Sequence, residues 1–314
     1  MTKGVILNSV EPGVEQFPNQ FVVCIAATRP AFILASVIPV FLGLSFAIYQ
    51  GYPLDGVMVK LILLAGILLH AAINVLNDYY DVLNGTDEAN SERVYLYTGG
   101  SRFIQNGVLS KLQMLSHGIG LILVVIMIGI YLISQTGSGL FWLGLAGLLL
   151  GWGYSTPPLR LNSRGLGEFA VLAGFGLIPL GAGLVQTGEF LWELIVVALP
   201  LALLTTNLLH INQFPDRKVD IVAGKLHWVA RFGSDVARVP VDHSCGVGGL
   251  FAADPVRFAA NDCTDCHLAS TFDRQGSTAH VALSSTVTTV GSSYSYDHCC
   301  YVDAWNLVIH CAGV

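Results

Sequence analysis

One stretch near the end of a long apolar run carries side chains that could do chemistry. It reads NVLNDYYDVLNGTD from residue 74 to 87, and its polar residues are spaced i, i+3, i+4 and i+7: Asn74, Asn77, Asp78 and Asp81. On a helix this spacing predicts one polar face, here called the first acidic stripe. Ionisable groups beside a membrane-length apolar run are costly unless they face a cavity, an ion or a partner.

A second stretch, NQFPDRKVD from residue 212 to 220, repeats the arrangement at the end of another apolar run. Its stripe is spaced i, i+4 and i+8 and consists of Asn212, Asp216 and Asp220. This set is called the second acidic stripe. Two such stripes at helix ends predict a single site.

The chemistry of these side chains points to magnesium and diphosphate. Mg²⁺ prefers oxygen ligands, usually one or two carboxylates completed by phosphate oxygens and water. Bound beside a diphosphate, it neutralises charge that develops on the leaving group as a C–O bond breaks. The candidate metal ligands and catalytic carboxylates are Asp78, Asp81, Asp216 and Asp220, with Asn74 and Asn212 as further polar partners. The alternative is that these acids cap helices and solvate cytoplasmic loops.

The composition places these stripes in a membrane protein. The chain is 53% hydrophobic and 11% charged, with a mean hydropathy of +0.63, whereas soluble domains have about 25% charged residues. A net charge of −6 and the lack of a basic, aromatic-interleaved patch argue against nucleic acid as a partner. No cleavable signal peptide is recognisable.

The hydropathy pattern predicts an all-α bundle of transmembrane helices. Residues 1–30 are expected to form an N-terminal segment that lies partly along the interface, and residues 31–232 the membrane core. Six spans are expected, at about 31–49, 57–77, 118–134, 140–154, 166–185 and 191–211, with a kink at Pro200. Six spans that begin inside place both stripes on the same side of the membrane.

Basic residues predict which side that is. The three connections on the opposite side, near 50–56, 135–139 and 186–190, contain no Lys or Arg. The stripe side carries Lys3, Arg29, Arg93, Arg102, Lys111, Arg160, Arg164, Arg217, Lys218, Lys225 and Arg231. By the positive-inside rule the stripes face the cytoplasm, in the cytoplasmic membrane.

The paired motifs resemble those of the UbiA superfamily of intramembrane aromatic prenyltransferases. Asn74-x3-Asp78-x2-Asp81 corresponds to the first motif of that family and Asp216-x3-Asp220 to the second. Within the family, NDYYDVLNGTD, GGSRFIQNGVLS (99–110) and YSTPPLRLNSRGLGE (154–168) are most similar to 1,4-dihydroxy-2-naphthoate polyprenyltransferases of menaquinone synthesis. The resemblance covers about residues 28–232 and implies a helical bundle with a central cavity for a polyprenyl tail.

The resemblance also implies roles for individual residues. The two stripes would hold Mg²⁺ and diphosphate, and Tyr154 would face the allylic cation or orient the acceptor. The residues expected to bind the diphosphate are Asn74, Arg102, Asn212, Lys218, Arg160 and Lys225. The alternative for each basic residue is an ordinary cytoplasmic charge, and for Tyr154 an interfacial aromatic. His70 and His210, both within spans, are expected to make helix-packing hydrogen bonds.

The chain departs from the family pattern after Arg231. Residues 233–314 contain six of the seven Cys but no Lys and no Glu, and no run there is long and apolar enough to span a membrane. The three further spans usual in the family are therefore expected to be absent. The expectation for this Cys-rich tail is an aberrant or frameshifted segment, and the alternative is a genuine added domain.

The sequence thus predicts a membrane enzyme that transfers a polyprenyl group from a polyprenyl diphosphate to an aromatic acceptor, expected to be 1,4-dihydroxy-2-naphthoate. Its expected partners are these two substrates, Mg²⁺ and the lipid bilayer. The alternatives are a prenyltransferase with another acceptor, such as 4-hydroxybenzoate or a tetrapyrrole, a non-catalytic membrane protein for ion binding or transport, and an inactive truncated product.

Overall fold

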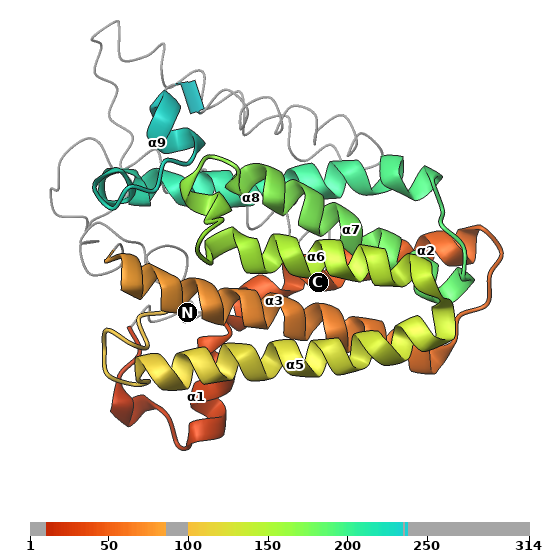
Figure 1. The fold of residues 1–314 in the computed structure, drawn as a ribbon, viewed down its shortest axis with the longest axis horizontal. Coiled ribbons are helices and arrows are strands. Elements are labelled where there is room, and N and C mark those ends of the chain that lie inside the picture. The colour runs from red at the N-terminus through yellow and green to blue at the C-terminus, as the bar shows by residue number, and fades with distance from the viewer. Residues whose placement is uncertain (1–10, 86–99, 235, 238–314) are drawn as a thin grey trace, which may run out of the picture. The chain divides into compact units, whose positions relative to one another are not determined.

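The computed structural model describes residues 11–85, 100–234 and 236–237, and all regular elements in that part of the chain are helices (Figure 1). The prediction of an all-α fold is confirmed. Six long helices correspond to the six predicted spans. They are α2 (Pro30–Tyr49), α3 (Gly56–Asn84), α5 (Lys111–Thr136), α6 (Ser138–Ser155), α7 (Gly167–Thr187) and α8 (Glu193–Val222).

Among the described helices, five are long and apolar enough to cross a membrane. The exception is α6, a continuous helix of 18 residues that contains several glycines. It follows α5 directly, since Gly137, with a φ of 105°, is the only residue between the two helices. A positive φ of this kind is readily adopted only by glycine, which explains the sharp reversal of the chain.

Both helices that carry an acidic stripe continue past the predicted ends of their spans. Helix α3 ends at Asn84 rather than near residue 77, and the left-handed Gly85 terminates it. Helix α8 runs through Pro200 and Pro215 to Val222 rather than ending near residue 211. The stripes therefore lie within the last turns of regular helices, so the helical spacing assumed for them applies.

The helix starts follow from local sequence. Pro30 occupies the first turn of α2, where its missing N–H costs nothing. The Asp55 carboxylate accepts hydrogen bonds from two backbone N–H groups at the start of α3. At the start of α5, Ser110 and Gln113 form a capping box, in which each side chain bonds the backbone of the other residue.

Extensive packing joins α3 to α5, α2 to α7 and α7 to α8, and α6 lies against α5, α7 and α3 (Figure 1). Helices α2 and α7 approach closely at Gly43, where a Cβ atom would collide with the Pro179 carbonyl oxygen and lie 2.9 Å from Ala182 Cβ. Small residues permit such contacts between membrane helices. The short helix α1 (Gln20–Ala27) buries Val23 and Ala27 in a cluster at the end of α3 that carries the first acidic stripe.

At the opposite end of the bundle, Tyr52 donates a hydrogen bond to Glu189 Oε2 at 3.2 Å and links the α2–α3 connection to the α7–α8 connection. This bond and the negative charge of Glu189 raise the pKa of the Tyr52 phenol.

The chain keeps contact with the bundle beyond residue 232, where the predicted membrane core ends. Helix α9 (Trp228–Phe232) packs against α8, and the buried Ala237 accepts a hydrogen bond through its carbonyl oxygen from His210 Nε2 at 2.8 Å. The remainder of the predicted Cys-rich tail lies outside the described residues, as do residues 1–10 and 86–99.

Candidate active site

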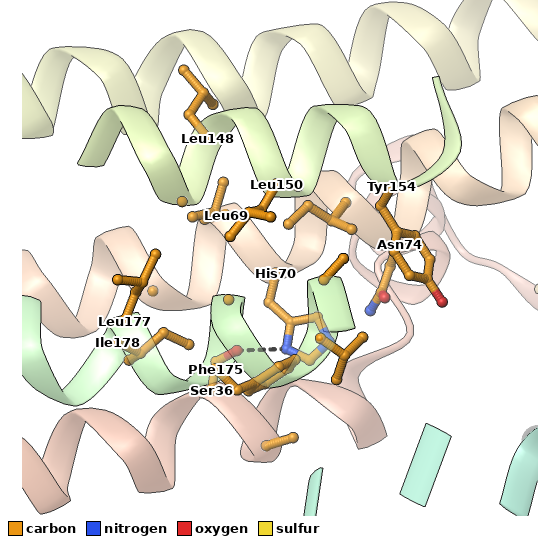
Figure 2. Close-up of a pocket in the computed structure, with 18 of the residues that line it drawn as sticks. Ser36, Leu69, His70, Asn74, Leu148, Leu150, Tyr154, Phe175, Leu177 and Ile178 are labelled. Carbon is orange, nitrogen blue, oxygen red and sulfur yellow. Dashed lines mark hydrogen bonds between the residues drawn. The ribbon is translucent and has the colours of Figure 1, made fainter. Parts of the chain in front are cut away.

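A cavity of about 580 Å³ lies among the long helices (Figure 2). Side chains of α2, α3, α5, α6, α7 and α8 line it, together with Lys225 and His227 from the connection between α8 and α9. Most of the wall is apolar, and the charged side chains lie at one end. The volume is in the range of protein sites for small molecules.

Three residues of the first acidic stripe line this cavity, namely Asn74, Asn77 and Asp81. Asn74 donates a hydrogen bond from Nδ2 to the Thr28 carbonyl oxygen at 3.0 Å, which ties α3 to the turn before α2. Asn77 donates from Nδ2 to Asp81 Oδ2 at 3.2 Å, one helical turn away. The side chain of Asp81 is thus oriented by a neighbour on its own helix.

All three residues of the second acidic stripe also line the cavity. Lys225 joins the two stripes, because its Nζ lies 2.8 Å from Asp81 Oδ1 and 3.9 Å from Asp220 Oδ1. All three side chains are largely buried, with exposed fractions of 13%, 7% and 9% respectively. One ammonium group therefore lies between carboxylates that are well over one hundred residues apart in the sequence.

The other oxygen of the Asp220 carboxylate contacts a histidine. His227 Nε2 lies 3.1 Å from Asp220 Oδ2, and both residues are buried. His227 is also the N-cap of α9, because its Nδ1 accepts a hydrogen bond from the Ala230 N–H at 3.2 Å.

Asp78 takes a different position from the rest of its stripe. It is buried, does not line the cavity, and accepts a hydrogen bond through Oδ2 from the Ser101 N–H at 3.1 Å. Its Oδ1 lies 3.9 Å from Nη1 of Arg29, whose side chain does line the cavity and stacks on the Phe32 ring. Asp78 thus fixes the segment that follows Gly100 to helix α3.

The connection between α6 and α7 supports the charged end of the cavity from another side. Ser155 donates a hydrogen bond from Oγ to Asn77 Oδ1 at 2.5 Å, and Asn162 donates to Ser155 Oγ at 3.4 Å. The Leu226 N–H donates to the Ser163 carbonyl oxygen at 2.9 Å. Both stripes are therefore connected to this loop, the first through Ser155 and the second through the 225–227 segment.

The structure separates the predicted site residues into two groups. Those that line the cavity are Asn74, Asp81, Tyr154, Asn212, Asp216, Asp220 and Lys225. Those that do not line it are Asp78, Arg102, Arg160 and Lys218. Arg160 and Lys218 are exposed, and Arg102 forms an ion pair with Glu11 at 3.8 Å. The roles assigned to both groups remain predictions.

Sequence reasoning missed two residues at the charged end. Arg29 was interpreted only as a positive-inside charge, and its left-handed backbone, with a φ of 56°, gave no signal in the sequence. His227 was not singled out, because its partner Asp220 lies on the preceding helix. A signal was available for His227, since Gly224 predicts a chain reversal after α8.

Deeper in the cavity, two polar side chains meet between α2 and α3. Ser36 Oγ and His70 Nδ1 are 2.7 Å apart, and the His70 ring contacts Phe175 edge-on with ring centroids 5.7 Å apart (Figure 2). The prediction of a helix-packing hydrogen bond is confirmed for His70, which bonds α2 from α3, whereas His210 bonds the Ala237 carbonyl oxygen beyond α9. His70 additionally lines the cavity, which that prediction did not include.

Comparison with known proteins identifies the family of this chain. The sequence pattern described as the UbiA prenyltransferase family matches residues 36–259, which is most of the chain. The chain belongs to the UbiA prenyltransferase family. The resemblance derived from the two motifs is confirmed, and the family match extends beyond the predicted limit at residue 232.

Individual members of the UbiA family are similar to this chain in sequence. The chain is 27% identical over 212 residues to UbiA prenyltransferase domain-containing protein 1 of Dictyostelium discoideum, covering 67% of this chain and 63% of that protein. It is 27% identical over 203 residues to 1,4-dihydroxy-2-naphthoate octaprenyltransferase of Bacillus subtilis, covering 63% and 62%. The chain therefore spans somewhat less than two thirds of the length of these relatives.

A solved structure shares the fold. It is a UbiA homolog from Archaeoglobus fulgidus bound to GPP and Mg²⁺, with a TM-score of 0.55, 14% sequence identity, and coverage of 93% of this chain and 99% of that one. Membership of the UbiA family, with five helices among the described residues able to cross a membrane, makes this a multi-pass membrane protein.

Proposed function

We propose that this protein transfers a polyprenyl group from a polyprenyl diphosphate to an aromatic acceptor inside the membrane. The observation that carries the proposal is the cavity, because residues of both acidic stripes lie at one end of it and apolar side chains line the rest. A prenyl diphosphate has the same polarity, with a charged head and a long apolar tail.

The cavity is long enough for such a tail. Along α3 its lining extends from Ile62 to Asp81, which at 1.5 Å per residue corresponds to about 28 Å. That length is close to the hydrocarbon thickness of a bilayer, about 30 Å. A short soluble substrate would leave most of this apolar wall unused.

The charge at the polar end supports a metal-dependent site. The charged side chains that line the cavity are three carboxylates, from Asp81, Asp216 and Asp220, and two cations, from Arg29 and Lys225. An anionic diphosphate is not favoured by an excess of carboxylates unless a further cation is present. A divalent metal ion bound between the diphosphate and the carboxylates would supply that cation.

The donor atoms fit Mg²⁺. Within the described residues no three His, Cys, Asp or Glu side chains form a metal-binding group of their own. Mg²⁺ needs only one or two carboxylates when phosphate oxygens and water complete its octahedron. Asn212 Oδ1, which is buried and accepts no hydrogen bond from the described residues, is a further available oxygen. Asp81, Asp216, Asp220 and Asn212 are the residues that would hold the ion. The UbiA homolog whose fold this chain shares was solved with GPP and Mg²⁺.

The residues of the chain then have separate tasks. The metal ion would supply the positive charge that stabilises the departing diphosphate. Lys225 and Arg29 add positive charge at the same end of the cavity. The apolar wall excludes water from the allylic cation that remains when the C–O bond breaks. Tyr154, at the polar end of α6, contributes an electron-rich ring to that wall (Figure 2).

The aromatic acceptor is proposed to bind beside His70. Ser36 and His70 form a polar pair within the otherwise largely apolar middle of the cavity. Since Ser36 engages Nδ1, the ring nitrogen that remains for a ligand is Nε2. A hydroxyl group both donates and accepts, so a phenolic hydroxyl can pair with His70 in either tautomer. Dihydroxynaphthoate offers two hydroxyls, and the name of the Bacillus subtilis relative supports this acceptor.

We place the charged end of the cavity on the cytoplasmic side of the cytoplasmic membrane. The support is the charge pattern, since Arg29, Arg160, Lys218 and Lys225 lie at or next to helix ends on the side of the bundle that carries the stripes. A diphosphate substrate made in the cytoplasm would then reach the site directly.

The experiment uses membranes that contain the full chain, incubated with Mg²⁺, a radiolabelled polyprenyl diphosphate and one acceptor at a time. Prenylated dihydroxynaphthoate is the expected product, and Asp81→Asn and Asp220→Asn should lower its rate by at least about 100-fold, the scale of losing one preorganised charge-stabilising group. Lys111→Met, which changes an exposed lysine at the start of α5 that does not line the cavity, is the matched control.

Two results would contradict the proposal. One is the absence of any prenylated product with dihydroxynaphthoate, hydroxybenzoate or a tetrapyrrole. The other is product formation that Asp81→Asn leaves unchanged. Product from hydroxybenzoate or a tetrapyrrole alone would retain the prenyl transfer and replace the acceptor.

A further inference from the structure

We propose that His227 is a positioning residue, which fixes the Asp220 carboxylate in one orientation so that Oδ1 faces the metal and diphosphate. The inference rests on the proposed function, since it assigns Asp220 to that role. It concerns a residue outside both family motifs, located seven positions after Asp220 in the connection to α9.

The hydrogen bonds of the ring determine its tautomer. The Ala230 N–H donates to His227 Nδ1 at 3.2 Å, so Nδ1 must present a lone pair. The proton of the neutral ring is therefore on Nε2, which lies 3.1 Å from Asp220 Oδ2. The cap of α9 thus makes Nε2–H a donor aimed at Asp220. Histidines that hold carboxylates or metals commonly have their second nitrogen fixed in this way.

The surroundings hold the ring in place. His227 is 3% exposed, and the residues on either side of it are anchored through their backbone N–H groups. The Leu226 N–H donates to the Ser163 carbonyl oxygen at 2.9 Å, and the Trp228 N–H donates to Glu168 Oε1 at 3.0 Å. Because these contacts hold the ring in place, its hydrogen bond can restrain the orientation of the Asp220 carboxylate.

Capping alone does not account for a histidine here. Ser, Thr, Asn and Asp are the preferred N-cap residues and would satisfy the Ala230 N–H. None of these short side chains could cap α9 and also reach Asp220 as the imidazole does through its two nitrogens. The geometry therefore favours a role for the Nε2–H donor beyond the helix start.

Two substitutions separate the effects of the two hydrogen bonds that the His227 ring makes, with Asp220 and with the Ala230 N–H. His227→Asn places an acceptor near the Nδ1 position and keeps the cap, but it loses the donor to Asp220. His227→Gln places an N–H donor near the Nε2 position and loses the cap. Both are made in the full chain, purified in detergent, and compared with the wild type.

Three quantities are measured for each protein. They are the unfolding temperature without Mg²⁺, its rise on adding Mg²⁺ with a non-hydrolysable prenyl diphosphate analogue, and the Mg²⁺ concentration for half-maximal prenyl transfer. For His227→Asn the expected result is a near wild-type unfolding temperature, a smaller Mg²⁺-induced rise, and a Mg²⁺ requirement raised about 10-fold or more. For His227→Gln the expected result is a lower unfolding temperature with a Mg²⁺ requirement close to that of the wild type.

Trp228→Phe is the matched control. It removes the hydrogen bond from Trp228 Nε1 to the Gly165 carbonyl oxygen, 2.9 Å long, in the same segment without touching Asp220. It should lower the unfolding temperature and leave the Mg²⁺ requirement unchanged. The inference is overturned if His227→Asn keeps the wild-type Mg²⁺ requirement, or if all three variants raise it equally. A wild type that forms no product and shows no Mg²⁺-induced rise would instead refute the proposed function.

Discussion

Replacing Lys225 with Met removes the ammonium group that lies between the two acidic stripes. Lys225 is 13% exposed, and its Nζ is 2.8 Å from Asp81 Oδ1 and 3.9 Å from Asp220 Oδ1. With an effective dielectric constant of about 20, the attraction across 2.8 Å is about 6 kcal/mol before desolvation is subtracted. Met has a similar length and no charge, so the substitution leaves two neighbouring buried carboxylates without this cation.

The expected loss of stability follows from these distances and from the burial of the three side chains. Removing one partner of a buried ion pair destabilises a protein by about 3–5 kcal/mol, because the remaining charge is left uncompensated. For a chain of this size the unfolding temperature should fall by on the order of 10 °C. Mg²⁺ offers a replacement cation, so it should stabilise Lys225→Met more than it stabilises the wild type. Binding to the folded state alone raises stability with ligand concentration.

The assay is thermal unfolding of the purified chain in detergent, without and with millimolar Mg²⁺. Lys111→Met serves as the control, since Lys111 is an exposed lysine at the start of α5 that does not line the cavity. Its unfolding temperature should stay close to that of the wild type, with or without Mg²⁺. The reasoning is refuted if Lys225→Met is as stable as the wild type without Mg²⁺, or if Mg²⁺ stabilises both proteins equally.

Three further predictions concern single contacts. Asp78→Ala leaves a buried N–H donor and a nearby guanidinium without their carboxylate, and should destabilise the chain by about 2–4 kcal/mol in chemical unfolding. His70→Leu should raise the KM for the aromatic acceptor about 10-fold, the value of one hydrogen bond, without changing the KM for the prenyl diphosphate. Gly43→Ala forces a methyl group into the backbone of α7 and should lower the unfolding temperature by several degrees, whereas Gly120→Ala, where the methyl group meets no atom within 4 Å, should not.

Each of these has an outcome that would count against it. A fully stable Asp78→Ala protein would mean that the Ser101 contact is unimportant. Equal changes in both KM values for His70→Leu would indicate a general loss of helix packing rather than acceptor binding. Equal unfolding temperatures for the two glycine variants would show that α2 and α7 can separate without cost.

Helical periodicity predicted much of the first acidic stripe but not the direction of every side chain. At 3.6 residues per turn, Asp78 and Asp81 are about 60° apart around the helix axis. That difference suffices for Asp81 to line the cavity while Asp78 faces Ser101. Spacing along the helix does not determine which residues of a stripe face the cavity. That depends on the segments that pack against the helix.

The same periodicity explains the position of Lys218, which lies within the second motif, but not that of Lys225, which follows α8. Lys218 lies two residues from both Asp216 and Asp220 on α8, so it projects from the opposite side of the helix. Lys225 follows Gly224, whose φ of 76° reverses the chain and returns the lysine to the cavity. The exposure of Lys218 was therefore predictable from the sequence, whereas the ion pairs of Lys225 depend on a turn whose direction the sequence does not specify.

The three buried aspartates among the described residues share one arrangement, which would suit the proposed metal site. In Asp78, Asp81 and Asp220, Oδ2 accepts a hydrogen bond, respectively from the Ser101 N–H, the Asn77 amide and His227 Nε2. In each of them Oδ1 faces a cation, Arg29 for the first and Lys225 for the other two. In each carboxylate, Oδ2 thus orients the group, and Oδ1 makes a contact with a cation that another cation could replace. A metal ion that displaced Lys225 would meet Oδ1 atoms already in place, so binding would require little reorganisation of either stripe.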